Sequence, residues 1–132
     1  MIGKPLILIV DDDGNFLEIL STKLKASGFD TAVAHSGTEA FTESQKILPD
    51  LILMDILMPG VGGTDAALAI KQNPKTSDVK IAFLTSLKDP WPSVPVEYDK
   101  LSKAIGMEDF IEKTNDLDSI VNKIKEILAR IR

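Results

Sequence analysis

The chain has 132 residues and a formal net charge of −5, with 44% hydrophobic and 27% charged residues, which indicates one ordinary globular domain with a buried core. The acidic balance argues against direct binding to nucleic acid, because neutralising phosphates needs a basic surface. The absence of cysteine excludes disulfides, thiolate metal sites and cysteine nucleophiles.

The chain begins with a predicted strand and helix. Residues 6–10 are all apolar, which indicates a strand buried on both faces, and they lead into an acidic run at 11–13. The helix that follows ends at Gly28, a favourable C-terminal cap. Its apolar positions are Leu17, Leu20 and Leu24. Residues 31–34 are predicted to form a second, short strand.

A second helix and a third strand come next. Ser36 and Glu39 have the spacing of a capping box, which predicts the start of a helix. Residues 51–54 form another wholly apolar run, and this predicted strand leads into the carboxylate of Asp55. Ligands of open α/β sheets bind beyond the carboxyl ends of the strands, so Asp55 stands where chemistry is expected.

The next elements are an Ala-rich helix and a fourth strand. The helix is predicted to follow the Gly-rich turn at 60–63 and to stop before Pro74, and residues 79–84 are predicted to form a strand that ends in Thr85. Residues 88–98 contain three prolines, which excludes a regular helix there.

The last third of the chain contains one strong signal and two weak ones. We expect a short helix at 100–105 and a last strand at 110–111, the latter mainly from the alternation of elements. A clear amphipathic helix follows, with Asn115 or Asp116 as its cap. Its apolar positions are Leu117, Ile120, Val121, Ile124, Ile127, Leu128 and Ile131.

Alternation of five strands with five helices predicts an α/β fold. We expect residues 1–132 to form one domain with a doubly wound, five-stranded parallel sheet of flavodoxin-like topology, flanked by five helices. The favoured strand order is 2-1-3-4-5, because it places the first and third strands side by side at a switch point.

That order brings Asp11, Asp12 and Asp55 together. Two carboxylates about 4 Å apart repel by roughly 4 kcal/mol at an effective dielectric constant near 20, so either one is protonated or a cation lies among them. The available ligands are oxygens, which favours a hard cation such as Mg²⁺. Asp13, by contrast, is equally well explained as a helix cap.

Two further polar groups are expected at the same edge. Thr85 ends the fourth strand, and Lys113 follows the fifth. A carboxylate nucleophile, a divalent cation and donors for phosphoryl oxygens suit phosphoryl transfer. The single histidine, His35, is interpreted as a surface loop residue.

Several segments together resemble the receiver domains of response regulators in two-component signalling, in particular the single-domain chemotaxis regulators. The similarity covers essentially the whole chain. The matching segments are Ile-Leu-Ile-Val-Asp-Asp-Asp (7–13), Ala-His-Ser-Gly-Thr-Glu-Ala (34–40), Pro-Asp-Leu-Ile-Leu-Met-Asp-Ile-Leu-Met-Pro-Gly (49–60), Leu-Thr-Ser (84–86) and Gly-Met-Glu-Asp-Phe-Ile-Glu-Lys (106–113).

The resemblance implies a role for each acid. Asp55 would be the phosphoacceptor, and it would take its phosphoryl group from a histidine kinase or a histidine phosphotransfer protein. Asp11, Asp12 and Asp55 would bind Mg²⁺, with the backbone carbonyl of Leu57 as a further ligand.

The resemblance also implies a switch. Thr85 would bind a phosphoryl oxygen, Lys113 would pair with the phosphoryl group, and Phe110 would be the switch aromatic. Family members commonly have proline after the lysine, in a cis peptide, whereas this chain has Thr114. A cis bond before a residue other than proline costs about 2.5–4 kcal/mol, so we expect a trans peptide and a differently aimed Lys113.

Two alternative functions remain open. The run Asp11-x-Asp13-Gly14-Asn15 also resembles the first motif of haloacid-dehalogenase-type phosphatases, in which Asp11 would be the nucleophile and Asp13 the acid/base. The chain is short for that family, and this reading leaves Asp55 unused. The domain could also be a binding module that works without phosphorylation.

The expected partners are proteins. Besides the phosphodonor, we expect an unknown downstream protein target, no direct nucleic-acid contact, no membrane contact, and a monomer or a phosphorylation-dependent dimer. The domain would catalyse only its own phosphorylation and dephosphorylation. No apolar run approaches the length of a membrane span, and the first residues resemble a strand rather than a signal peptide, so we expect a cytoplasmic location.

Overall fold

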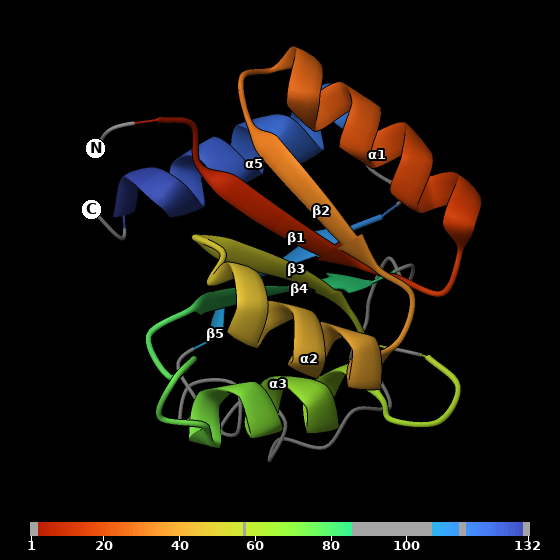
Figure 1. Ribbon diagram of the computed structural model, residues 1–132. Coiled ribbons are helices and arrows are strands. Elements are labelled where there is room, and N and C mark those ends of the chain that lie inside the picture. Colours follow the sequence, from red (N-terminus) through yellow and green to blue (C-terminus); the bar gives the residue numbers. More distant parts are fainter. Residues whose placement is uncertain (1–2, 57, 86–106, 114–115, 131–132) are drawn as a thin grey trace.

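The computed structural model describes residues 3–56, 58–85, 107–113 and 116–130. Parallel strands alternate with helices along this part of the chain (Figure 1). The elements are β1 (Leu6–Val10), α1 (Gly14–Ala26), β2 (Asp30–Ala34), α2 (Gly37–Ile47), β3 (Leu51–Asp55), α3 (Gly63–Gln72), β4 (Lys80–Thr85), β5 (Met107–Glu112) and α5 (Leu117–Arg130).

The five strands form one parallel sheet in the order β2-β1-β3-β4-β5. This confirms the predicted topology, including the neighbouring positions of the first and third strands. The expected helix at 100–105 and the Pro-rich segment 88–98 lie outside the described residues, so the structure describes four of the five predicted helices.

Two helical layers cover the two faces of the sheet. Helices α1 and α5 lie on one face, and α2 and α3 lie on the other (Figure 1). Successive side chains of a strand point to opposite faces, so Ile7 and Ile9 of β1 belong to the core beneath α1 and α5, whereas Leu8 and Val10 belong to the other core. All four are fully buried, as a strand covered on both faces requires.

The helix ends follow the predicted capping chemistry. Ser36 Oγ accepts a hydrogen bond from the Glu39 amide at 3.1 Å, and Asp116 Oδ1 accepts one from the Ser119 amide at 2.8 Å. Gly28 follows α1 with a φ of 99°, a left-handed conformation that glycine adopts at little cost. These contacts confirm the predicted ends of α1 and α2, and they identify Asp116 as a cap of α5.

Strand β5 is longer than the sequence predicted. It extends from Met107 to Glu112, whereas the pattern indicated residues 110–111 only. It is an edge strand that pairs with β4 alone, and its pairing shifts register between Ile81 and Ala82. An edge strand does not need the continuous apolar run of a central strand, so its sequence signal is weak. Within the described residues, no helix has both the length and the apolar character needed to cross a bilayer.

Candidate functional site

The candidate site lies at the carboxyl edge of the sheet, where β1 and β3 end side by side. Val10 pairs with Met54, so the residues that follow them, Asp11 and Asp55, emerge next to each other. Asp11 is fully buried and Asp55 is 6% exposed, whereas Asp12 is exposed. Each of the three acids offers a carboxylate oxygen, and these oxygens all lie within 4.8 Å of one another. The predicted convergence of the three acids is therefore present.

Backbone contacts hold Asp11 in this position. Its amide donates to the carbonyl of Ala34 in β2 at 3.1 Å, and its own Oδ1 accepts the amide of Asp13 at 3.0 Å. This second hydrogen bond forms a tight turn within residues 11–13. The Asp11 carboxylate lies beside Asp55 at the end of β3, and the chain continues into α1.

The first turn of α3 packs closely against the backbone of Asp55, and the contact is made at Gly63. Gly63 is the first residue of α3, and its amide donates to the carbonyl of Ile56 at 3.1 Å. A Cβ atom at this position would overlap the carbonyl oxygen of Asp55. Only a residue without a side chain lets the first turn of α3 lie this close behind the candidate phosphoacceptor. The sequence predicts a Gly-rich turn here, but its pattern does not indicate this contact.

Lys113 reaches over the acids from the end of β5. Its Nζ lies 2.6 Å from Asp11 Oδ2 and 4.0 Å from Asp55 Oδ2, and its side chain is 16% exposed. Burial lowers the pKa of this lysine, but the contact with Asp11 and the charges of Asp55 and Asp11 outweigh burial and raise it overall. The ammonium of Lys113 therefore lies at the acidic cluster. The expectation that it is aimed differently from the lysine of family members stays a prediction. The peptide between Lys113 and Thr114 lies outside the described residues.

The ring of Phe16, in the first turn of α1, lies beneath the ammonium of Lys113. Sequence analysis missed this residue. Phe16 fits the helical spacing of the apolar face of α1, and nothing in that spacing distinguishes a core phenylalanine from one that contacts a distant lysine.

The electrostatics of the cluster favour a bound cation or proton. Burial, followed by the negative charge of Asp11, raises the pKa of Asp55 to about 7, although Lys113 opposes this effect. Asp11 Oδ2 is buried and accepts no hydrogen bond of good geometry from the described residues, so the ion pair with Lys113 is its main compensation. Among the described residues, the Lys113 ammonium thus pairs with two buried carboxylates, and the exposed carboxylate of Asp12 lies close to both of them.

The donor set fits a hard divalent cation. Three carboxylates supply oxygen ligands within a small volume, and one of them has a buried oxygen without a hydrogen bond from the described residues. Mg²⁺ is commonly held by one or two carboxylates, with water and phosphate oxygens completing the set. The predicted further ligand, the carbonyl of Leu57, lies outside the described residues.

Asp13 and His35 lie outside this cluster. Asp13 Oδ1 accepts the amides of Asn15 at 3.0 Å and Phe16 at 3.3 Å, so its carboxylate caps α1. His35 is exposed, and its Nδ1 lies 3.4 Å from Glu39 Oε1. Capping explains Asp13 without a catalytic role, and His35 is the surface residue that the sequence predicted.

The structure describes the backbones of Thr85 and Phe110 but not their side chains. Leu84 of β4 pairs with Asp55, so Thr85 is one step beyond the phosphoacceptor candidate on the neighbouring strand. Phe110 pairs with Phe83 within β5 and β4. The strand positions of both residues agree with the prediction, whereas the placement of the hydroxyl and of the ring stays a prediction.

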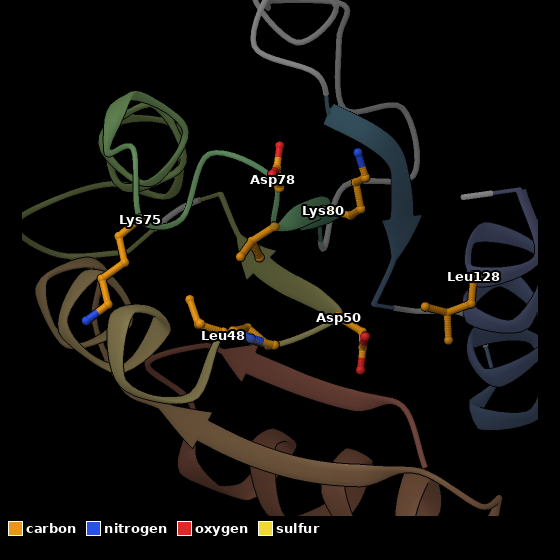
Figure 2. Close-up of a pocket in the computed structure, with 8 residues that line it drawn as sticks. Leu48, Asp50, Lys75, Asp78, Lys80 and Leu128 are labelled. Carbon is orange, nitrogen blue, oxygen red and sulfur yellow. The ribbon is translucent and has the colours of Figure 1, made fainter. Parts of the chain in front are cut away.

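A pocket of about 420 Å³ lies at the opposite edge of the sheet, where β3 and β4 begin. Figure 2 shows Leu48, Lys80 and Leu128 around it, from the end of α2, the start of β4 and α5. Its lining also includes Asp50 and Lys75, and the acidic cluster takes no part in it. Because β3 separates Asp50 from Asp55, this pocket is distinct from the candidate site.

Comparison with known proteins agrees with the geometry. The family model described as the response regulator receiver domain matches residues 7–125. The DNA-binding response regulator MtrA of Mycolicibacterium paratuberculosis is 36% identical over 126 residues, which cover 96% of this chain and 49% of that protein. The chain spans about half the length of the curated relatives it matches.

Solved structures show the same fold. A CheY-like response regulator receiver domain protein from Methanospirillum hungatei superposes with a TM-score of 0.82 at 26% identity, covering 98% of this chain and 97% of that one. The chemotaxis protein CheY4 of Vibrio cholerae gives a TM-score of 0.82 at 23% identity, covering 95% and 99%. The second similarity concerns the fold alone.

Proposed function

The chain belongs to the response regulator receiver domain family, and we propose that Asp55 is the residue through which this phosphorylation-dependent signalling switch is turned on. The observation that carries this assignment is the convergence of Asp11, Asp12 and Asp55 at one edge of the sheet, with Lys113 paired to the buried acids. Of the three carboxylates, that of Asp55 ends the central strand β3.

The proposed reaction is a phosphoryl transfer from a phosphohistidine. A carboxylate oxygen of Asp55 attacks the phosphorus, an O–P bond forms, and the N–P bond of the donor breaks. The electron pair of that bond returns to the imidazole ring, which then takes a proton from solvent. Lys113 neutralises negative charge on the incoming group, and its ammonium favours the ionised form of Asp55.

The cofactor of this reaction is Mg²⁺ in our proposal. Asp11, Asp12 and Asp55 would hold it through their carboxylates, with the carbonyl of Leu57 as a further ligand. When bound, it supplies positive charge that offsets the repulsion between the carboxylates and the phosphoryl oxygens.

The switch itself would involve β4 and β5. An aspartyl phosphate adds charge and strong acceptor oxygens. We infer that Thr85 donates to one of these oxygens, that Lys113 pairs with another, and that Phe110 repacks in response. The surface around β4, β5 and α5 would then change between two conformations and be read by a partner.

The proposed partners are a histidine kinase or histidine phosphotransfer protein as donor and a downstream protein as target. The domain would act in the cytoplasm as a monomer or a phosphorylation-dependent dimer, without direct contact to nucleic acid or membrane. Its catalysis would be limited to its own phosphorylation and dephosphorylation. MtrA is described as DNA-binding, and any such output would belong to residues other than these.

Mass spectrometry after incubation with phosphoramidate and MgCl₂ tests the assignment. We expect a gain of one phosphoryl group, located at Asp55 by peptide mapping and absent from Asp55→Asn. Labelling of Asp11 instead would favour the haloacid-dehalogenase-type phosphatase, and no labelling at all would favour the phosphorylation-independent module. The comparisons give no support to either alternative, and the capping role of Asp13 argues against the first.

A further inference from the structure

The contact between Phe16 and Lys113 joins the start of α1 to the end of β5. Lys113 Nζ lies 4.7 Å from the centroid of the Phe16 ring. An ammonium within about 6 Å of an aromatic centroid is attracted by the negative face of the ring. The contact lies at the candidate site, because the same ammonium pairs with Asp11 and Asp55.

Both partners are anchored. Asp13 Oδ1 accepts the Phe16 amide at 3.3 Å, and the half-buried ring packs against the core between the sheet and helices α1 and α5. Lys113 lies two residues after Ile111, which is buried in that same core, and β5 is held to the sheet by its pairing with β4. The ring is therefore a fixed surface beneath a side chain that otherwise has a long and flexible stem.

The ring differs from the other neighbours of the ammonium in its chemistry. Asp11 and Asp55 are carboxylates, and both are proposed ligands of a divalent cation. An aromatic face carries no lone pair and no formal charge, so a hard cation does not compete for it. Among the neighbours of Lys113 in the described part of the chain, Phe16 is thus one whose attraction for the ammonium is shared neither with the metal nor with the phosphoryl group.

We propose that Phe16 is a positioning residue that holds Lys113 beside Asp55 through the face of its ring. This role rests on the proposed function of Asp55 as phosphoacceptor. Phe16 makes no contact with the reacting atoms in this account, and it acts only through the placement of the ammonium.

The test compares variants that keep or remove the aromatic face. Phosphorylation by phosphoramidate with MgCl₂ is followed by mass spectrometry for the native protein, Phe16→Tyr, Phe16→Leu and Phe41→Leu. We expect Phe16→Leu to lower the rate constant by about threefold to tenfold, and Phe16→Tyr to retain most of it. Phe41 is half-buried against the other core, so Phe41→Leu is the matched control and should leave the rate unchanged. Equal losses for Phe16→Leu and Phe16→Tyr would overturn the proposal.

A double-mutant cycle shows whether Phe16 acts through the lysine. In the Lys113→Gln background, Phe16→Leu should have almost no further effect on the rate constant. If it slows phosphorylation there as much as in the native background, the ring acts through packing alone and the proposal is wrong.

Nuclear magnetic resonance separates this proposal from the proposed function. In the native protein without phosphodonor, the ε-methylene protons of Lys113 should be shifted upfield by the ring current of Phe16. The shift should persist in Phe16→Tyr and vanish in Phe16→Leu. Its absence from the native protein would overturn the positioning role even if Asp55 is phosphorylated. A shift in a protein that takes no phosphoryl group would instead overturn the role assigned to Asp55, and with it the positioning role that rests on it.

Discussion

The Asp55 carboxyl is held in a setting that favours its protonated form. Burial and the charge of Asp11 raise its pKa to about 7, against about 3.9 in an unfolded chain. Between these values the folded protein binds the proton and the unfolded chain does not, so stability falls as the pH rises. In the metal-free protein we expect this group to remove about 2 to 4 kcal/mol of unfolding free energy between pH 4 and pH 7.

Urea unfolding in the presence of a chelator measures this effect. Asp55→Asn removes the titrating group and leaves the other acids in place, so its stability advantage over the native protein should grow from pH 4 to pH 7. A constant difference across this range would show that the carboxyl does not titrate with a raised pKa.

Gly63 offers a second prediction at the scale of one residue. A methyl group there would overlap the Asp55 carbonyl, so Gly63→Ala must displace either α3 or the phosphoacceptor. We expect a loss of about 2 to 4 kcal/mol of unfolding free energy and slower phosphorylation.

Gly14 provides the matched control for Gly63. It is the first residue of α1, as Gly63 is of α3, and a Cβ atom there would meet nothing within 4 Å. Gly14→Ala should be neutral or stabilise the protein by about 0.4–1 kcal/mol. If Gly63→Ala and Gly14→Ala destabilise the protein equally in urea unfolding, the close contact behind Asp55 does not limit the residue at position 63.

At the scale of elements, the acidic run 11–13 divides between two tasks. Asp13 caps α1, whereas Asp12 is exposed and belongs to the carboxylate cluster. Asp13→Ala should therefore cost about 1 kcal/mol of stability and still allow phosphorylation of Asp55. Asp12→Ala should leave stability within about 0.5 kcal/mol and weaken Mg²⁺ binding roughly tenfold.

Thermal unfolding and isothermal titration calorimetry with MgCl₂ measure the two effects. If Asp13→Ala abolishes Mg²⁺ binding, or Asp12→Ala leaves it intact, the division of labour within the run is wrong.

The burial of each strand explains which strands the sequence could predict. Strands β1, β3 and β4 are covered on both faces, so their apolar runs were unmistakable, and their parallel arrangement placed Asp11 beside Asp55. The edge strand β5 needed no such run, and most of it was missed. Phe16 and Lys113 are distant in the chain, and the contact of Gly63 with Asp55 depends on how the turn between them packs, so only the packed structure reveals both.

At the scale of the whole molecule, cation binding and folding should be coupled. A ligand that binds only the folded state adds about 2.7 kcal/mol of stability at a concentration 100 times its Kd. We expect MgCl₂ to raise the unfolding temperature of the native protein and to raise that of Asp12→Ala much less. Sodium chloride at the same ionic strength is the control, and equal effects of the two salts would indicate screening rather than a metal site.

The strand order has one more consequence. The acids stand on β1 and β3, in the interior of the sheet, whereas Lys113 follows its outermost strand, β5. Central strands exchange their amide hydrogens last and edge strands first, because edges open at lower free energy. The metal-binding and phosphate-accepting acids thus follow interior strands, whose amide hydrogens should exchange late, whereas Lys113 follows an edge strand, whose amide hydrogens should exchange earlier.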